Sequence, residues 1–163
     1  MTQSLDLITH HLSSSEVLPE LVKDVLSKRV ECRFRAKGYS MSPFIKDGDV
    51  ITLSSLQGDL PRIGDVVAFI HPVNDKLVIH RVIEKRNGSY CVMGDNALGM
   101  DGLIPANNIL GCVKEINRDG KNLRIGLGPE RFLIAFLNRR GLLFPLLVPV
   151  WKLIRPLVRR WVR

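Results

Sequence analysis

The segment from residue 30 to residue 127 alternates short stretches of period-two hydrophobicity with tight-turn residues, and this pattern constrains the fold most strongly. In residues 30–36, apolar side chains alternate with charged ones, as in a strand with one buried face. Asn-Gly at 87–88 and Asp-Gly at 119–120 favour two-residue hairpin turns. Short strands joined by such turns form antiparallel sheets, so we predict a mainly β domain with a coiled or barrel-like sheet.

The same patterns predict the individual elements and divide the chain into three parts. Strands are predicted at residues 30–37, 49–54, 64–70, 77–85, 89–93, 109–117 and 123–127. Helices are predicted at residues 16–29, 131–140 and 146–163. The predicted parts are an N-terminal helical arm (1–29), a β domain (30–130) and a C-terminal amphipathic helical tail (131–163).

The composition limits the class of protein. With 163 residues, 45% of them hydrophobic, the chain fits one globular domain. Cys32, Cys91 and Cys112 are odd in number and widely spaced, so we expect free thiols in a reducing compartment, with no metal site and no cofactor. Residues 1–11 contain no Lys or Arg and no long apolar run, so a cleaved secretory signal is not expected.

The net charge of +8 comes entirely from the tail. Residues 131–163 contain eight basic and no acidic residues, and 20 of these 33 residues are apolar. The longest charge-free run, residues 141–151, is eleven residues long, whereas a spanning helix needs about 20. The tail therefore predicts peripheral or monotopic attachment to an anionic membrane surface, from the cytoplasmic side. Packing on the body or on a partner is the alternative. Nucleic-acid binding is not expected, because the basic residues are embedded in apolar sequence.

One serine, one histidine and two aspartates are candidates for an acyl-transfer site. Ser40 follows the first predicted strand, and Gly38 before it permits an unusual backbone dihedral and close approach of a substrate. A serine hydroxyl needs a base to become a good nucleophile, and His80 is the best candidate. The backbone N–H of Ser40 is a natural donor to an oxyanion. Asp101 is suited to orient the imidazole, and Asp95 competes for that role.

His80 lies in a predicted strand of alternating pattern. Val78, His80 and Val82 share one face of this strand, and the other face carries Ile79, Arg81 and Ile83. A histidine on such a face is also compatible with a hydrogen-bonded core residue. For Asp95 the competing interpretation is a turn carboxylate that caps backbone N–H groups or pairs with Arg81.

Taken together, these motifs resemble those of the type I signal peptidase and LexA-like peptidase superfamily. The matching segments, which span about residues 30–116, are residues 38–43, 47–49, 64–67, 79–83 and 94–96, followed by Asp101. Most bacterial members have a lysine at the position of His80. The histidine resembles the branch that contains endoplasmic-reticulum and archaeal signal peptidases.

The resemblance implies a mostly antiparallel β fold and a membrane-bound serine endopeptidase that cleaves signal or leader peptides without a metal. It implies that Ser40 is the nucleophile, His80 the general base and Asp101 the orienting acid. Gly38, Met41, Arg81 and Asp95 are then possible supporting residues. The implied partners are a peptide or protein substrate and a membrane surface.

Two other functions are compatible with the same motifs. A LexA-like regulator cleaves itself in a linker at Ala-Gly or Cys-Gly, but neither dipeptide precedes Ser40, and there are few residues for a DNA-binding domain. A non-catalytic module for membrane or partner binding could use the same scaffold. The complete Ser, His and Asp set argues against that alternative.

Overall fold

The computed structural model describes residues 17–56, 58–143 and 145–146. Within them lie the helices α1 (Val17–Ser27) and α2 (Arg131–Arg139) and the short 3-10 turn η1 (Ala106–Asn108). The strands are β1 (Cys32–Arg35), β2 (Val50–Ser55), β3 (Val66–Ile70), β4 (Leu77–Arg86), β5 (Ser89–Met93), β6 (Met100–Pro105), β7 (Ile109–Arg118) and β8 (Lys121–Leu123).

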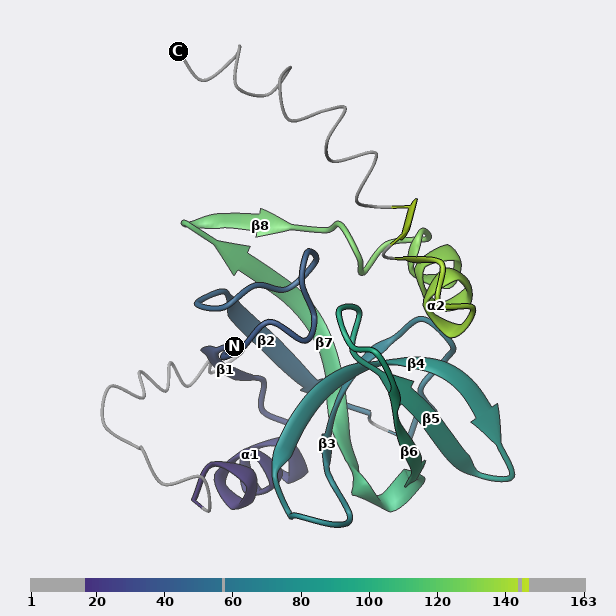
Figure 1. The fold of residues 1–163 in the computed structure, drawn as a ribbon. Helices are drawn as coiled ribbons and strands as arrows, with labels where there is room; N and C mark the ends of the chain where they lie inside the picture. The colour runs from purple at the N-terminus through teal and green to yellow at the C-terminus, as the bar shows by residue number, and fades with distance from the viewer. Residues whose placement is uncertain (1–16, 57, 144, 147–163) are drawn as a thin grey trace.

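The strands form one antiparallel sheet in the order β1-β2-β7-β3-β4-β5-β6, with β8 added beside β7. The sheet is open, since β1 and β6 stand at its two ends. It is also strongly coiled, and Figure 1 shows β4 curving away from β2 and β7. The described residues therefore confirm a mainly β architecture with a coiled rather than a closed sheet.

Strand β3 lies between two hydrophobic clusters, which explains its continuous apolar sequence. Val66 and Ala68 pack in a cluster with side chains of α1, β1, β2 and β7. Val67 and Phe69 point the other way, into a cluster formed with β4, β5 and β6. Because both faces are covered, four successive residues of β3 are buried. The coil of the sheet thus places one hydrophobic cluster on each side of β3.

Helix α1 belongs to the first of these clusters. Its residues Val22, Val25 and Leu26 are buried against β1, β2 and β7, and Figure 1 shows the helix lying against that end of the sheet. Burial of each such side chain contributes about 1.5–3 kcal/mol. The described part of the predicted N-terminal arm is therefore a packing helix of the β domain.

Most predicted strands are confirmed to within a few residues, but the strand predicted at residues 123–127 is wrong. The chain turns there instead, and Leu127 N–H donates to Arg124 O at 3.1 Å. Gly126 has φ +88°, a left-handed backbone conformation outside the range of a regular strand, and its carbonyl accepts a hydrogen bond from the buried Arg81 at 2.8 Å. The strand that pairs with β7 is β8, which ends at Leu123.

The structure also contains a strand that the sequence pattern did not predict. Strand β6 has little alternation, because Ile104 is its one buried side chain. In the tail, the helix predicted at residues 131–140 is confirmed as α2. The helix predicted at residues 146–163 lies almost entirely outside the described residues. Within the described part of the chain, no helix has the length and apolar character needed to cross a bilayer.

Ser40 lies in the loop between β1 and β2, and this loop is closed at its base. Ala36 N–H donates to Asp49 O at 2.8 Å, and Gly48 N–H donates to Ala36 O at 2.9 Å. The Asp49 side chain is 3% exposed and accepts hydrogen bonds from Arg118 Nε and Nη2 at 2.8 and 2.7 Å. Lys46 N–H donates to the same carboxylate at 2.7 Å. Asp49 thus fastens the loop to the end of β7.

Replacing Asp49 by Asn tests this anchor through its pH dependence. Burial acts to raise the pKa of Asp49, but hydrogen bonds from Arg118 and from Lys46 N–H hold it below its ordinary value of 3.8. Because folding lowers this pKa, the ionised carboxylate stabilises the fold at pH values above 3.8. The stabilisation is lost as the pH falls through the lower pKa of the folded state. At pH 7, Asp49→Asn should lower the free energy of unfolding in urea by about 1–3 kcal/mol.

The difference in the free energy of unfolding between Asp49→Asn and wild type should shrink when unfolding in urea is measured near pH 3. Asp59→Asn, at an exposed position, serves as the control and should change stability little at either pH. A deficit for Asp49→Asn that stays constant down to pH 3 contradicts the assignment of its carboxylate as the anchor.

Candidate active site

The backbone around Ser40 is fixed from both sides. Gly38 has φ +91°, a conformation that residues with a side chain rarely adopt, and its N–H donates to Asp47 Oδ1 at 2.8 Å. After the serine, Met41 O accepts hydrogen bonds from the N–H groups of Phe44 and Ile45 at 3.1 and 3.0 Å. These bonds order the loop and leave Ser40 at an exposed position within it.

Met41 does not lie on the surface of the site. It is 4% exposed and packs with Ile45 in the hydrophobic cluster beneath the loop. Met41, predicted as a possible supporting residue, thus contacts the core and not the surface of the site. Met41 anchors the serine loop from below.

Gly94, between β5 and β6, is the point at which the serine loop meets the histidine strand. A Cβ added at Gly94 would lie 2.6 Å from Ser40 O and 3.0 Å from His80 Nε2. The Ser40 carbonyl also accepts a hydrogen bond from Asn96 N–H at 2.7 Å, and Asn96 Nδ2 donates to Tyr39 O at 3.1 Å. The absence of a side chain at Gly94 lets the two segments approach each other.

His80 forms a pair with Asp101. The imidazole Nδ1 is hydrogen-bonded to Asp101 Oδ2, and the two side chains are 9% and 21% exposed. A carboxylate at Nδ1 favours the tautomer with the proton on that nitrogen. Nε2 is then an acceptor, and it faces Gly94 on the side of the Ser40 loop. This is the orientation that a general base for the Ser40 hydroxyl requires.

A β-bulge places Asp101 at the histidine. In the pairing of β5 with β6, Cys91 lies opposite Leu103 and Met93 lies opposite Met100. Asp101 and Gly102 therefore share one partner position, opposite Val92, and Gly102 has φ +93°. Bulges of this kind redirect a side chain out of the normal alternation. Sequence periodicity alone could not have predicted where the carboxylate of Asp101 points.

Asp95 has a different partner. Its two carboxylate oxygens accept hydrogen bonds from Arg81 Nε and Nη2 at 2.8 and 2.7 Å, and both side chains are fully buried. Burial raises the pKa of Asp95, and the guanidinium acts in the opposite direction. The structure therefore matches the interpretation of Asp95 as the partner of Arg81, while Asp101 is the carboxylate in contact with His80.

Arg81 also binds the backbone of two other segments. Its Nη1 donates to Gly64 O at 2.7 Å and to Gly126 O at 2.8 Å, and its guanidinium lies 5.6 Å from the centre of the Phe44 ring. Removal of one partner from a buried ion pair of this kind typically costs about 3–5 kcal/mol. Arg81 supports the site from beneath and has no exposed surface through which to touch a substrate.

The serine and the imidazole do not form a hydrogen bond in this structure. Among the described residues, Ser40 Oγ has no hydrogen-bond partner, and the backbone N–H of Ser40 has no acceptor. Contacts between nucleophile and base are often long in ligand-free sites and shorten when substrate binds. The candidate site thus has an oriented imidazole, an exposed hydroxyl and a backbone N–H without an acceptor among the described residues.

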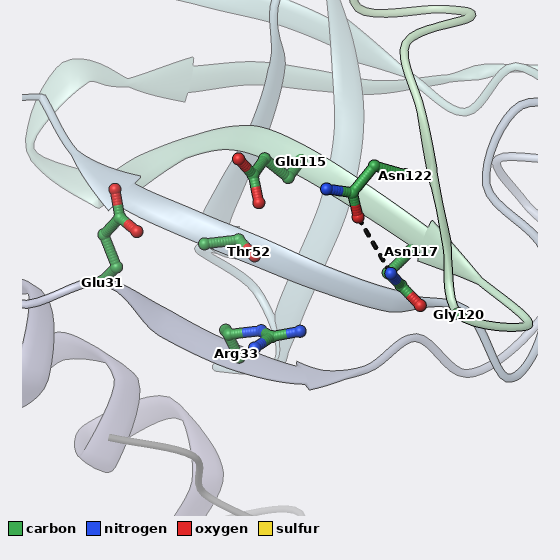
Figure 2. Close-up of a pocket in the computed structure, with 7 residues that line it drawn as sticks. All are labelled: Glu31, Arg33, Thr52, Glu115, Asn117, Gly120 and Asn122. Carbon is green, nitrogen blue, oxygen red and sulfur yellow. Dashed lines mark hydrogen bonds between the residues drawn. The ribbon is translucent and has the colours of Figure 1, made fainter. Parts of the chain in front are cut away.

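A polar hollow lies elsewhere on the sheet. It is lined by residues of β1, β2, β7 and β8 and their flanks, shown in Figure 2: Glu31, Arg33, Thr52, Glu115, Asn117, Gly120 and Asn122. None of the candidate catalytic residues lines it. No group of three or more His, Cys, Asp or Glu side chains in the described ranges is arranged to hold a metal ion.

The three cysteines, all within the described residues, are free thiols. Cys32 and Cys91 are buried, and burial raises the pKa of the half-buried Cys112 to about 12. A thiol with such a pKa is a poor nucleophile at neutral pH. The cysteines therefore offer no alternative nucleophile to Ser40.

Comparison of the chain with protein-family models and with curated protein sequences gives no match.

The substitution Gly94→Ala tests the close approach described above. The new methyl group would overlap Ser40 O and His80 Nε2, and we expect it to lower the free energy of unfolding by about 1–3 kcal/mol. The backbone amide resonances of Ser40 and Asn96 should shift at the same time. Gly99→Ala is the matched control, because a Cβ there meets nothing within 4 Å. Equal stability of the two variants would contradict the contact.

Proposed function

We propose that this chain is a membrane-associated serine endopeptidase of the signal peptidase and LexA-like type that cleaves signal or leader peptides. The observation that carries the proposal is the Asp101–His80 pair, whose free Nε2 faces the segment that carries Ser40. The antiparallel coiled sheet and the order of the sequence motifs are compatible with that superfamily. The chemistry itself is argued from the three side chains.

The reaction proceeds in two halves through an acyl-enzyme. Ser40 Oγ attacks the carbonyl carbon of the scissile peptide bond while His80 Nε2 takes the hydroxyl proton. Asp101 stabilises the imidazolium, and the Ser40 N–H donates to the developing oxyanion. The imidazolium then gives its proton to the leaving amine as the C–N bond breaks. Water, deprotonated by His80, hydrolyses the ester and restores the serine.

Helix α2 supports the membrane part of the proposal. Phe132, Leu133 and Phe136 are 49%, 59% and 53% exposed, and helical periodicity places Arg140 on the same face. Arg139 lies at the edge of this face and pairs with Glu84 at 3.2 Å. The opposite face carries the buried residues Ile134, Ala135 and Asn138. Aromatic and aliphatic side chains flanked by arginines suit the boundary between acyl chains and anionic head groups. We propose that this face lies on the membrane surface.

The catalytic assignment predicts which substitutions abolish turnover. Peptide mixtures incubated with wild type should give cleavage products by mass spectrometry, and Ser40→Ala and His80→Ala should each lower kcat/KM at least about 1,000-fold. Asp101→Asn should lower it at least about 100-fold. All three variants should retain the wild-type circular dichroism spectrum.

A fluorophosphonate probe, which labels activated serine hydroxyls, tests whether Ser40 is the nucleophile. Wild type and Ser42→Ala, which alters a neighbouring hydroxyl, should label at Ser40, and Ser40→Ala should not. Undiminished cleavage by Ser40→Ala refutes the site. A protein that cuts itself and no added peptide, seen as a loss of intact mass, refutes cleavage of separate substrates.

The membrane assignment predicts an effect of the exposed aromatic residues of α2. The double substitution Phe132→Ser and Phe136→Ser should weaken binding to phosphatidylglycerol-containing vesicles at least about tenfold in a sedimentation assay, because each buried ring contributes about 1.5–3 kcal/mol. The exposed Val73, at 84%, provides the control Val73→Ser, which should bind as wild type does. Equal binding by the double variant would mean that this face is not the docking surface.

A further inference from the structure

Asn138 is a buried polar residue on the face of α2 that packs against the body. It is 4% exposed, and its neighbours on the same face, Ile134 and Ala135, are apolar. The side-chain amide donates to Gly94 O at 3.2 Å and approaches Asp95 Oδ1 at 3.4 Å. A helix that only needed to pack would carry an aliphatic residue at this position, since burying an amide is costly unless it is hydrogen-bonded.

The hydrogen bond from Asn138 fixes the carbonyl of Gly94, the residue at which the Ser40 loop and the His80 side chain meet. Gly94 lies against both Ser40 O and His80 Nε2. The next residue, Asp95, is fixed by Arg81 through two hydrogen bonds. Asn138 therefore holds the carbonyl of the peptide that links Gly94 to Asp95, while Arg81 holds the carboxylate that follows it. Together they fix the orientation of this peptide.

We propose that Asn138 is a positioning residue, which sets the separation between the Ser40 hydroxyl and His80 Nε2 by fixing the Gly94 peptide. This inference rests on the proposed peptidase function. It also gives α2 a second role, because the helix whose exposed face is proposed to contact lipid holds the active-site loop with its buried face. Misplacement of reacting groups by about 1 Å can cost on the order of 100-fold in rate.

The substitution Asn138→Leu removes both donor contacts at similar side-chain volume. We expect kcat for peptide hydrolysis to fall about 10- to 100-fold with KM within about twofold of wild type, because alignment rather than substrate binding is lost. The rate of fluorophosphonate labelling at Ser40 should fall in parallel. Asn138→Ser, a smaller change, should show the same division between kcat and KM, and urea unfolding establishes that each variant is folded.

Asn108 offers a matched control elsewhere in the fold. Its amide Nδ2 donates to the backbone oxygen of Ile70 at 2.9 Å and joins η1 to the end of β3. Asn108→Leu makes the same chemical change to the same type of hydrogen bond, and we expect kcat within about twofold of wild type. An equal loss of kcat in Asn108→Leu and Asn138→Leu would assign the effect to lost stability and overturn the proposal.

A measurement without substrate separates this inference from the proposed function. The backbone amide of Asn96, which donates to Ser40 O at 2.7 Å, should shift in the nitrogen–proton correlation spectrum of Asn138→Leu and stay in place in Asn108→Leu. An unshifted Asn96 amide in Asn138→Leu overturns the positioning role. If wild type neither cleaves peptides nor labels at Ser40, the proposed function fails, and the Asn96 resonance still decides whether Asn138 fixes this loop.

Discussion

Beneath the serine loop, the buried guanidinium of Arg81 meets the buried carboxylate of Asp95, and several segments converge on this pair. Arg81 lies on β4, Asp95 follows β5, and the same guanidinium donates to the carbonyl oxygens of Gly64 and Gly126. A buried ion pair is stable only when further hydrogen bonds satisfy the remaining donors and acceptors of both groups. The pair therefore requires the loop before β3, the turn before α2 and the loop that carries Gly94 to be in place together.

The alternation of side chains along β4 places His80 and Arg81 in two different environments. His80 and Arg81 are consecutive, so their side chains leave opposite faces of the strand. The imidazole reaches Asp101 and the neighbourhood of Gly94, where partial solvent access is maintained. The guanidinium reaches Asp95 in the interior. One short stretch of sequence thus supplies both the candidate base and the support that keeps the surrounding backbone in position.

The sequence predicted most of the sheet and part of the site, and the failures have identifiable causes. Alternation and hairpin dipeptides located β1 to β5 and β7, because these strands bury a regular face or both faces. Strand β6 was missed because its bulge at Asp101 and Gly102 breaks the alternation. The turn at Gly126 was mistaken for a strand because the partner of its carbonyl, Arg81, lies far away in sequence. The hydrogen bond from Asn138 to Gly94 O had no local signal in the sequence, since a single polar residue in an amphipathic helix gives no indication of what it touches.

The open ends of the sheet carry features that discourage self-association into filaments. Unpaired strand edges offer backbone donors and acceptors to another copy of the chain. At one end, β1 has four residues, which leaves few groups to pair. At the other, β6 is interrupted by Gly102 at a left-handed backbone angle and finishes at Pro105, which lacks an N–H. A variant with a longer, regular β6 would present a continuous template for pairing, so the irregularity that delivers Asp101 also shortens the edge open to another chain.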